Sequence, residues 1–138
     1  MRVVLDTNIW VSYLLTHRPP ISTIIDVMVA EDEVILVTSI ELLEELKRVL
    51  NYPKLKRFYT EKERNRFIAL AAAISEFVEL PDDTPRICRD PKDDMVIACA
   101  VAGAADVIVS GDVHLLEIGR AGNIPIVTAR QLVDSQKR

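Results

Sequence analysis

Two acidic residues follow short apolar runs of the sequence closely. Asp6 comes directly after residues 3–5, and Asp112 follows residues 107–109. If these runs are neighbouring parallel strands, both carboxylates meet at the rim where open α/β sheets bind their ligands. Each acid alone is equally well explained as a helix N-cap, which stabilises by about 1 kcal/mol. The two acids together at one rim favour a functional site.

One predicted helix, residues 39–50, leaves an acidic residue without a structural role. Its opening has the form of a capping box, which occupies Glu41. Glu44 can pair with Arg48 one turn later on the solvent-exposed face of this helix. Glu45 lies at the edge of the apolar stripe, where an acid either reaches back to solvent or points into a cleft. We favour the cleft.

A further acid stands at the start of a nearly all-apolar predicted helix, residues 92–103. Asp90 has the N-cap place, Pro91 the first helical position, and Asp93 the place of the third-position acid of a capping box. For Asp94 only the helix dipole remains, a contribution of roughly 0.3–1 kcal/mol. Crowding like charges here is costly unless a cation holds them together.

Neutral and basic side chains accompany these acids. Thr7, Asn8 and Ser110 lie at the same predicted rim, where they either cap helices or orient a water or a phosphate oxygen. Several cations elsewhere are candidates for contacts with a nucleic-acid backbone: Lys54, Lys56, Arg57, Arg86 and Arg89.

Strands and helices alternate along the sequence. Strands are predicted at residues 3–5, 34–37, 107–109 and 124–127, with a short fifth at 77–79. Helices are predicted at residues 7–15, 21–30, 39–50, 61–75, 92–103, 113–118 and 129–135, with loops at the proline-containing segments 19–20, 52–53 and 81–85. This alternation indicates an α/β fold with a parallel sheet covered by helices on both faces.

Length and composition limit the classes of protein. The 138 residues suit one domain, residues 1–138, and the core must be aliphatic because aromatic residues are only 5%. The net charge of −4 argues against binding nucleic acid by bulk charge alone. Cys88 and Cys99 lack further zinc ligands nearby, so we expect reduced thiols. Without a signal peptide or a membrane-spanning run, a cytoplasmic location is expected.

The order of Asp6, Glu45, Asp94 and Asp112, each in its setting, resembles the PIN-domain nucleases over nearly the whole chain. The motifs that carry the resemblance are Val4-Leu5-Asp6-Thr7-Asn8, Glu45-Leu46, Asp94-Met95-Val96-Ile97-Ala98 and Val109-Ser110-Gly111-Asp112. Residues 88–94 and 110–116 are similar to the branch described as toxins of toxin–antitoxin pairs. The resemblance implies a three-layer α/β/α sandwich with a parallel sheet of about five strands.

The resemblance also implies a function. The four acids would hold Mg²⁺ or Mn²⁺ for hydrolysis of phosphodiester bonds in single-stranded RNA, leaving 5′-phosphate and 3′-hydroxyl ends. A protein antitoxin and a homodimer are implied as partners; residues 68–74 are apolar enough for a dimer contact, although burial inside one chain explains them as well. Many relatives carry another acid where this chain has His114, so a second ion would depend on Asp93 or His114.

Two alternatives come from other classes of protein. A catalytically silent member of the same fold would act as a binding partner or scaffold, and His114 is compatible with that. A receiver-like phospho-acceptor domain would share the size, the sheet and an acidic rim. It would need a lysine at the end of the last strand, where residues 126–130 supply none, and it would not take an acid from a helix such as the one with Glu45.

Overall fold

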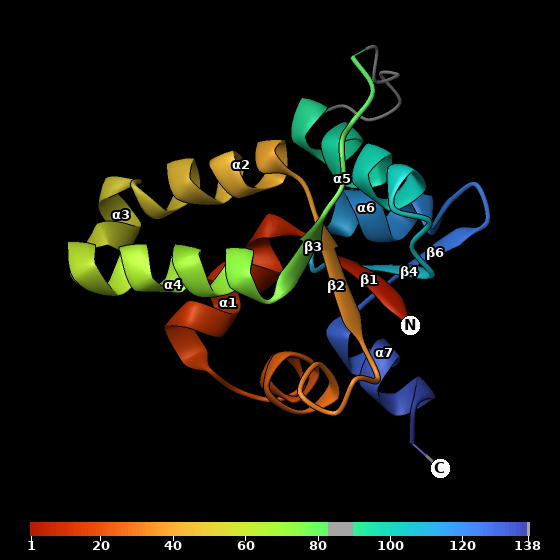
Figure 1. The fold of residues 1–138 in the computed structure, drawn as a ribbon, viewed down its shortest axis with the longest axis horizontal. Coiled ribbons are helices and arrows are strands. Elements are labelled where there is room, and N and C mark those ends of the chain that lie inside the picture. Colours follow the sequence, from red (N-terminus) through yellow and green to blue (C-terminus); the bar gives the residue numbers. More distant parts are fainter. Residues whose placement is uncertain (83–89, 138) are drawn as a thin grey trace.

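The computed structural model describes residues 1–82 and 90–137. The apolar runs form one sheet with the first strand near its centre (Figure 1). The strands stand in the order β3-β2-β1-β4-β6-β5, and all neighbours are parallel except the pair β5 and β6. Their bounds are β1 Arg2–Leu5, β2 Ile35–Thr38, β3 Ser75–Phe77, β4 Val107–Val109, β5 Arg120–Ala121 and β6 Ile124–Val127.

Helices connect the parallel strands and cover both faces of the sheet. Alternate residues of β1 face opposite sides: Val3 and Leu5 belong to one apolar cluster, and Val4 belongs to another. The first cluster holds residues of α1, η1, α2, α4 and α7, and the second holds residues of α5 and α6. The helices are α1 Thr7–Thr16, η1 Thr23–Met28, α2 Ile40–Leu50, α3 Pro53–Lys56, α4 Glu61–Ala73, α5 Pro91–Ala102, α6 Val113–Ile118 and α7 Ala129–Ser135.

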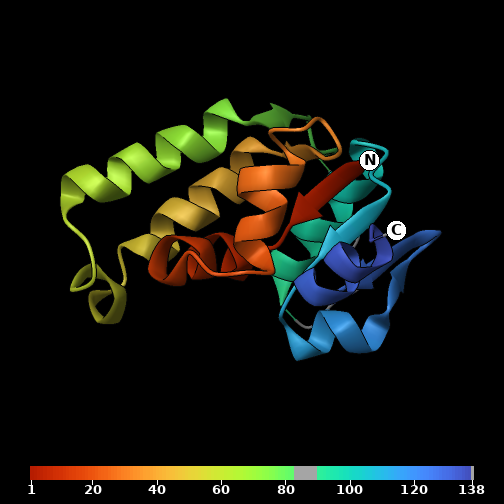
Figure 2. The ribbon, with the colours of Figure 1, turned by 90° about the horizontal axis from the view of Figure 1, so that it is seen from below.

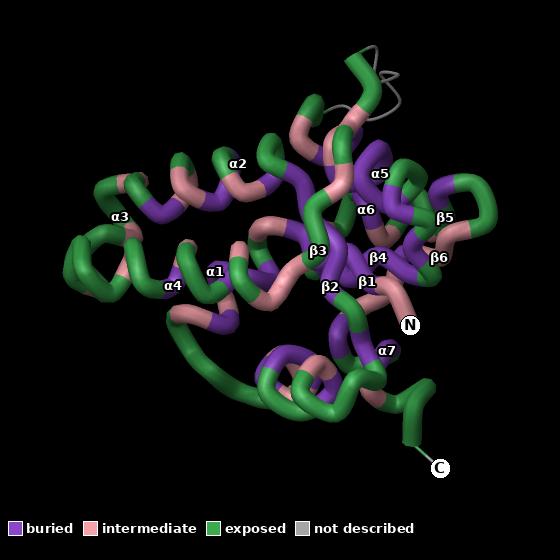
Figure 3. Tube along the Cα trace, viewed as in Figure 1, coloured by how far each residue is buried: buried purple, intermediate pink, exposed green. Residues whose placement is uncertain are grey.

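This arrangement confirms the predicted α/β/α architecture. The central strands β1, β2 and β4 are largely buried, whereas α3 and much of α4 are exposed (Figure 3). Seen from below, α3 and α4 lie at the opposite end of the molecule from α6 and α7 (Figure 2). Within residues 1–82 and 90–137, no helix is both long enough and apolar enough to cross a membrane.

The structure corrects four details of the predicted elements. Residues 53–56 form a helix rather than a loop, because proline is well tolerated in a first helical turn. The segment 23–28 is a π-helix, in which the Val29 amide donates to the Ile24 carbonyl. The strand expected at 77–79 begins earlier, at Ser75. The two-residue β5 was not predicted, because it is too short to leave an apolar pattern.

Candidate active site

The first and fourth strands are direct neighbours, as the predicted rim requires. Leu5 stands beside Val109 in the parallel pair β1 and β4. The next residue along β1 is Asp6, whose backbone amide donates to the Val109 carbonyl at 2.9 Å. Asp6 is buried, with 6% of its surface exposed, and Asp112 is half-buried. Both acids therefore lie beyond the carboxyl ends of adjacent strands.

Ser110 links the two acids of this rim. Its hydroxyl is fully buried; it donates to Asp6 Oδ2 at 2.8 Å and accepts the Asp112 amide at 2.9 Å. Asp112 is also the N-cap of α6, since its Oδ1 accepts the His114 amide at 2.8 Å. Asp6 occupies the N-cap position of α1, but its side chain makes no such capping bond. The capping explanation thus holds for Asp112 and fails for Asp6.

Asp93 is part of this acidic cluster. The predicted N-cap role of Asp90 is confirmed by its 3.0 Å bond from the Lys92 amide, but the predicted capping-box role of Asp93 is wrong. Asp93 is instead buried, and its pKa is raised to about 6. Burial is the largest cause of this shift, and repulsion from Asp112, Asp6 and Asp90 acts in the same direction. The Asp93 carboxyl group therefore experiences the field of the acids on the rim.

The pKa of Asp6 is raised as well. Burial is the largest cause, and the charges of Asp112 and Asp90 act in the same direction. Hydrogen bonds from the Ser110 hydroxyl and the Thr7 amide oppose the shift because they stabilise the carboxylate. An added positive charge would relieve this repulsion, which is the electrostatic condition for binding a cation.

Glu45 points inward from α2 but is held by two cations. It is 7% exposed; its Oε2 accepts Arg48 Nη2 at 2.6 Å, and Lys92 Nζ lies 3.3 Å from its Oε1. The predicted ion pair of Glu44 with Arg48 is wrong: Lys47 Nζ lies 3.1 Å from Glu44 Oε1 instead. Glu45 Oε1 has no hydrogen bond among the described residues despite the nearby ammonium. We regard this contact as an ion pair of poor hydrogen-bond geometry.

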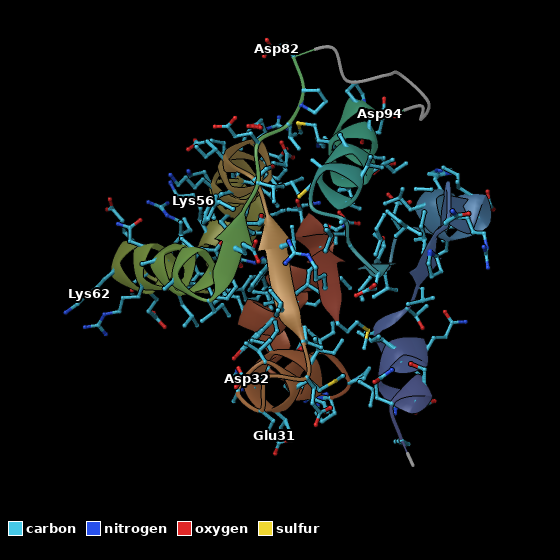
Figure 4. All side chains as sticks on the ribbon, turned by 45° about the vertical axis from the view of Figure 1, so that its right-hand side comes forward. Glu31, Asp32, Lys56, Lys62, Asp82 and Asp94 are labelled. Atoms are coloured by element: carbon cyan, nitrogen blue, oxygen red, sulfur yellow. The ribbon has the colours of Figure 1, made fainter. Side chains whose placement is uncertain are left out.

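The other predicted residues are found in three places: near the rim, at the α3 end of the molecule for Lys54, Lys56 and Arg57, or outside the described part of the chain. Asp94 is 5% exposed at the N-terminal end of α5 (Figure 4). Thr7 is half-buried and Asn8 is exposed in the first turn of α1, and His114 is exposed on α6. Arg86, Cys88 and Arg89 lie outside the described residues. Cys99 is a free, buried thiol.

Sequence reasoning missed two cationic partners of Glu45: Lys92 received no role, and Arg48 was assigned to Glu44 instead. Lys92 was placed only within a predicted helix, yet it brings a cation from α5 to an acid on α2. Arg48 is spaced to pair with either Glu44 or Glu45, and only the inward direction of Glu45 decides between them. The capping box expected to occupy Glu41 is also wrong: Ser39 is the N-cap and bonds to the Leu42 amide.

Carboxylate oxygens of this kind are the donors that Mg²⁺ and Mn²⁺ prefer. The raised pKa values of Asp6 and Asp93 fit a site that binds positive charge. Within residues 1–82 and 90–137, however, no three acidic, histidine or cysteine side chains lie close enough together to hold an ion. The donor chemistry fits these ions, although the described carboxylates do not already converge on one point, and Glu45 is engaged by Arg48 and Lys92.

A sequence model described as the PIN domain matches residues 2–114. The chain belongs to the PIN-domain family. This PIN domain is also 27% identical over 118 residues to the uncharacterized protein MJ1680 of Methanocaldococcus jannaschii, a match that covers 86% of this chain and 75% of that protein.

Solved structures share the fold of this PIN domain. VapBC2 from Rickettsia felis, crystallised with a DNA fragment from its promoter, matches with a TM-score of 0.64 and 15% identity, over 91% of this chain and 97% of that one. VapBC-1 from nontypeable Haemophilus influenzae matches with a TM-score of 0.59 and 17% identity, over 94% and 99%. FitAcB from Neisseria gonorrhoeae matches with a TM-score of 0.53 and 17% identity, over 93% and 98%.

Proposed function

We propose that this PIN domain is a Mg²⁺- or Mn²⁺-dependent nuclease that hydrolyses phosphodiester bonds in single-stranded RNA. The observation that carries the proposal is the buried hydroxyl of Ser110, which bonds to the Asp6 carboxylate and to the Asp112 backbone amide beyond the carboxyl ends of β1 and β4. The charges of both acids also act on the buried Asp93. Buried like charges lower the stability of the metal-free protein, and the raised pKa values of Asp6 and Asp93 reflect that repulsion together with burial. Such perturbed carboxylates are typical of functional sites.

Each acid of the site has a proposed part in holding the ion. Asp6, Glu45, Asp94 and Asp112 are the ligands inferred from the sequence. Asp93 is a further candidate because it is buried and the charges of Asp112 and Asp6 help to raise its pKa. A bound divalent cation supplies a Lewis acid that activates water and neutralises phosphate charge. Products with 5′-phosphate and 3′-hydroxyl ends are expected from the family resemblance.

Neutral groups at the rim position the acids and the substrate. The Ser110 hydroxyl and the Thr7 amide hold the Asp6 carboxylate in one orientation. Asn8 is exposed one residue later, so its amide is available to orient a water or a phosphate oxygen. Release of Glu45 from Arg48 and Lys92 would allow it to face the ion.

The toxin component of a toxin–antitoxin pair is the biological role we propose. The motifs at residues 88–94 and 110–116 are similar to that branch of PIN domains, and the likeness of fold to VapBC and FitAcB agrees with it. A protein antitoxin is then the proposed partner, a homodimer the proposed assembly, and the cytoplasm the proposed location.

Cleavage of end-labelled single-stranded RNA by the purified protein tests the activity. Reactions contain Mn²⁺, Mg²⁺ or EDTA, and the wild type is compared with Asp6→Asn and Asp94→Asn. We expect metal-dependent cleavage that both substitutions reduce at least a hundredfold, since each removes an ion ligand. Asp134→Asn is the control, because Asp134 is exposed on α7 and paired with Lys137. Equal cleavage by all four proteins would point to a contaminating nuclease.

A catalytically silent PIN domain is the second candidate. The ion pairs of Glu45 with Arg48 and Lys92 favour it, because they occupy an expected metal ligand. His114, where many relatives carry an acid, agrees with a weakened metal site. No cleavage of varied RNAs together with no Mn²⁺ binding by calorimetry would establish this candidate. Membership of the PIN family argues against the receiver-domain alternative.

A further inference from the structure

Positive charge is concentrated in one stretch of a chain whose net charge is negative. Residues 47–66 carry eight of the 17 Lys and Arg residues but only two of the 21 Asp and Glu residues. This stretch spans the end of α2, all of α3 and the start of α4, at one end of the molecule (Figure 1). The net charge of −4 therefore conceals a basic end and an acidic remainder.

Most cations of this basic end are not used within the protein. Within residues 1–82 and 90–137, five exposed cations of the stretch form no ion pair: Lys54, Lys56, Arg57, Lys62 and Arg66. The two acids of the stretch are engaged locally. Glu63 accepts the Thr60 amide at 3.0 Å in the capping box of α4, and Glu61 lies 3.8 Å from Arg64. These cations are therefore available to a negatively charged partner.

An exposed aromatic ring lies among the cations. Phe58 is 58% exposed, and the Arg57 guanidinium lies 4.8 Å from the centre of its ring. The Tyr59 hydroxyl donates to the Leu50 carbonyl at 2.6 Å, which ties this segment to the end of α2. An exposed ring costs free energy in water, whereas stacking on a nucleic-acid base would bury it.

We propose that the basic end binds the single-stranded RNA that the active site cuts, an inference that rests on the proposed function. Lys54, Lys56, Arg57 and Lys62 contact phosphates, and Phe58 stacks on a base. We call these five residues the α3–α4 patch. Lysine and arginine around an exposed ring form the usual combination for binding single strands without sequence preference.

Helix α2 connects the α3–α4 patch with the acidic rim. Glu45 lies five residues before the end of α2, which is about 8 Å along a helix. Lys47 and the exposed Arg48 occupy the stretch between them. Lys56 and Lys62 lie on the side of the molecule away from Asp94 (Figure 4). An RNA strand bound to the patch would therefore have to run along α2, past Lys47 and Arg48, to reach the acidic rim.

Fluorescence anisotropy in EDTA tests binding separately from cleavage. The probe is a fluorescein-labelled oligouridylate of about 12 nucleotides, within the usual site size for single strands. The patch variant replaces Lys54, Lys56, Arg57 and Lys62 by Gln. The control variant makes the same change in charge at four exposed cations elsewhere: Arg18, Arg120, Arg130 and Lys137. Circular dichroism and thermal melts confirm that both variants fold.

The patch variant should bind RNA at least tenfold more weakly than the wild type. Its plot of log Kd against log salt should be shallower by about 2.8, because each lost phosphate contact removes about 0.7. The control variant should retain the wild-type slope, although its overall affinity falls slightly. Phe58→Ala should weaken binding about tenfold without altering the slope. Phe77→Ala, at another exposed ring, should leave the RNA affinity unchanged.

The outcomes separate this inference from the proposed function. Equal affinity and slope in the patch and control variants would overturn the patch as an RNA surface, whatever the cleavage assay shows. So would failure of the wild type to bind RNA in EDTA, which would leave an acidic protein segment as the partner for these cations. Patch-dependent binding by a protein that never cleaves RNA with Mn²⁺ would support the patch and remove the nuclease.

Discussion

Ser110 joins two candidate acids through one hydroxyl group. The hydroxyl donates to Asp6 and accepts from the Asp112 amide, and it is fully buried. Ser110→Ala would remove the hydrogen bond of the Asp112 amide and one of the two bonds to the buried Asp6 carboxylate, at a cost of about 1–3 kcal/mol. Urea unfolding measures this loss. The same substitution should also raise the pKa of Asp6 further, because a bond that favours the carboxylate disappears.

Ser75 provides a matched control for Ser110. Its hydroxyl oxygen is buried but has no hydrogen-bond partner among the described residues. Replacing it by alanine removes an unsatisfied polar atom, so Ser75→Ala should leave the free energy of unfolding unchanged or slightly raise it. Equal losses in Ser75→Ala and Ser110→Ala would contradict the assigned role of the Ser110 bonds.

Asp93 should make the metal-free protein less stable as the pH rises. Its pKa is raised from 3.8 to about 6, so the folded state holds a proton that the unfolded state releases. The stabilising contribution is fully present below about pH 4 and is lost as the pH rises through about 6. Thermal melts in EDTA across this range should show a decline that Asp93→Asn reduces. An unchanged decline in the variant would mean that Asp6 alone dominates.

At the scale of elements, the close approach of α5 to β2 depends on a glycine. A Cβ atom added at Gly103 would lie 2.5 Å from Cγ1 of the buried Val37. Gly103→Ala should therefore lower the free energy of unfolding by about 1–3 kcal/mol, the usual cost of overpacking. Gly111 is the control, because an added Cβ there meets nothing within 4 Å. Similar urea midpoints for the two variants would argue against this packing contact.

The sequence predicted most elements because the period of the apolar residues matches their burial. Val3, Val4 and Leu5 form a continuous apolar run, as a strand buried on both faces requires, and Ser39 caps α2. Short elements such as α3 and β5 were missed, since four residues or fewer carry no usable period. The alternation of strands and helices predicted the three layers, but it did not predict that β5 forms one edge of the sheet.

The candidate site was predictable only in part. The sequence predicted that Asp6 and Asp112 would meet at one rim if their strands were neighbours, and the pairing of β1 with β4 shows that they are. The direction of Asp93 did not follow, because Asp93 and Asp94 are adjacent in one helical turn and only packing decides what each faces. The pairing of Arg48 with Glu45 was missed for the same reason: a spacing of three or four residues allows both partners.

For the whole molecule, a divalent cation should raise the stability of the folded state. Binding only to the native protein adds about 2.7 kcal/mol when the free ion is at 100 times its Kd. Mn²⁺ should therefore increase the melting temperature of the wild type, and EDTA should reverse the increase. Asp6→Asn should abolish the shift, while Asp134→Asn, at an exposed residue of α7 paired with Lys137, should retain it. A shift that both variants retain would place the ion elsewhere.

The short strands at both ends of the described sheet have a consequence for assembly. One edge is β3, with three residues, and the other is β5, with two. Edges this short offer few free backbone groups, so a second chain gains little by extending the sheet. Two copies would have to associate through helices, and α4 presents Leu70 at 44% exposure for such a contact. Growth of the sheet into fibrils is disfavoured by the same geometry.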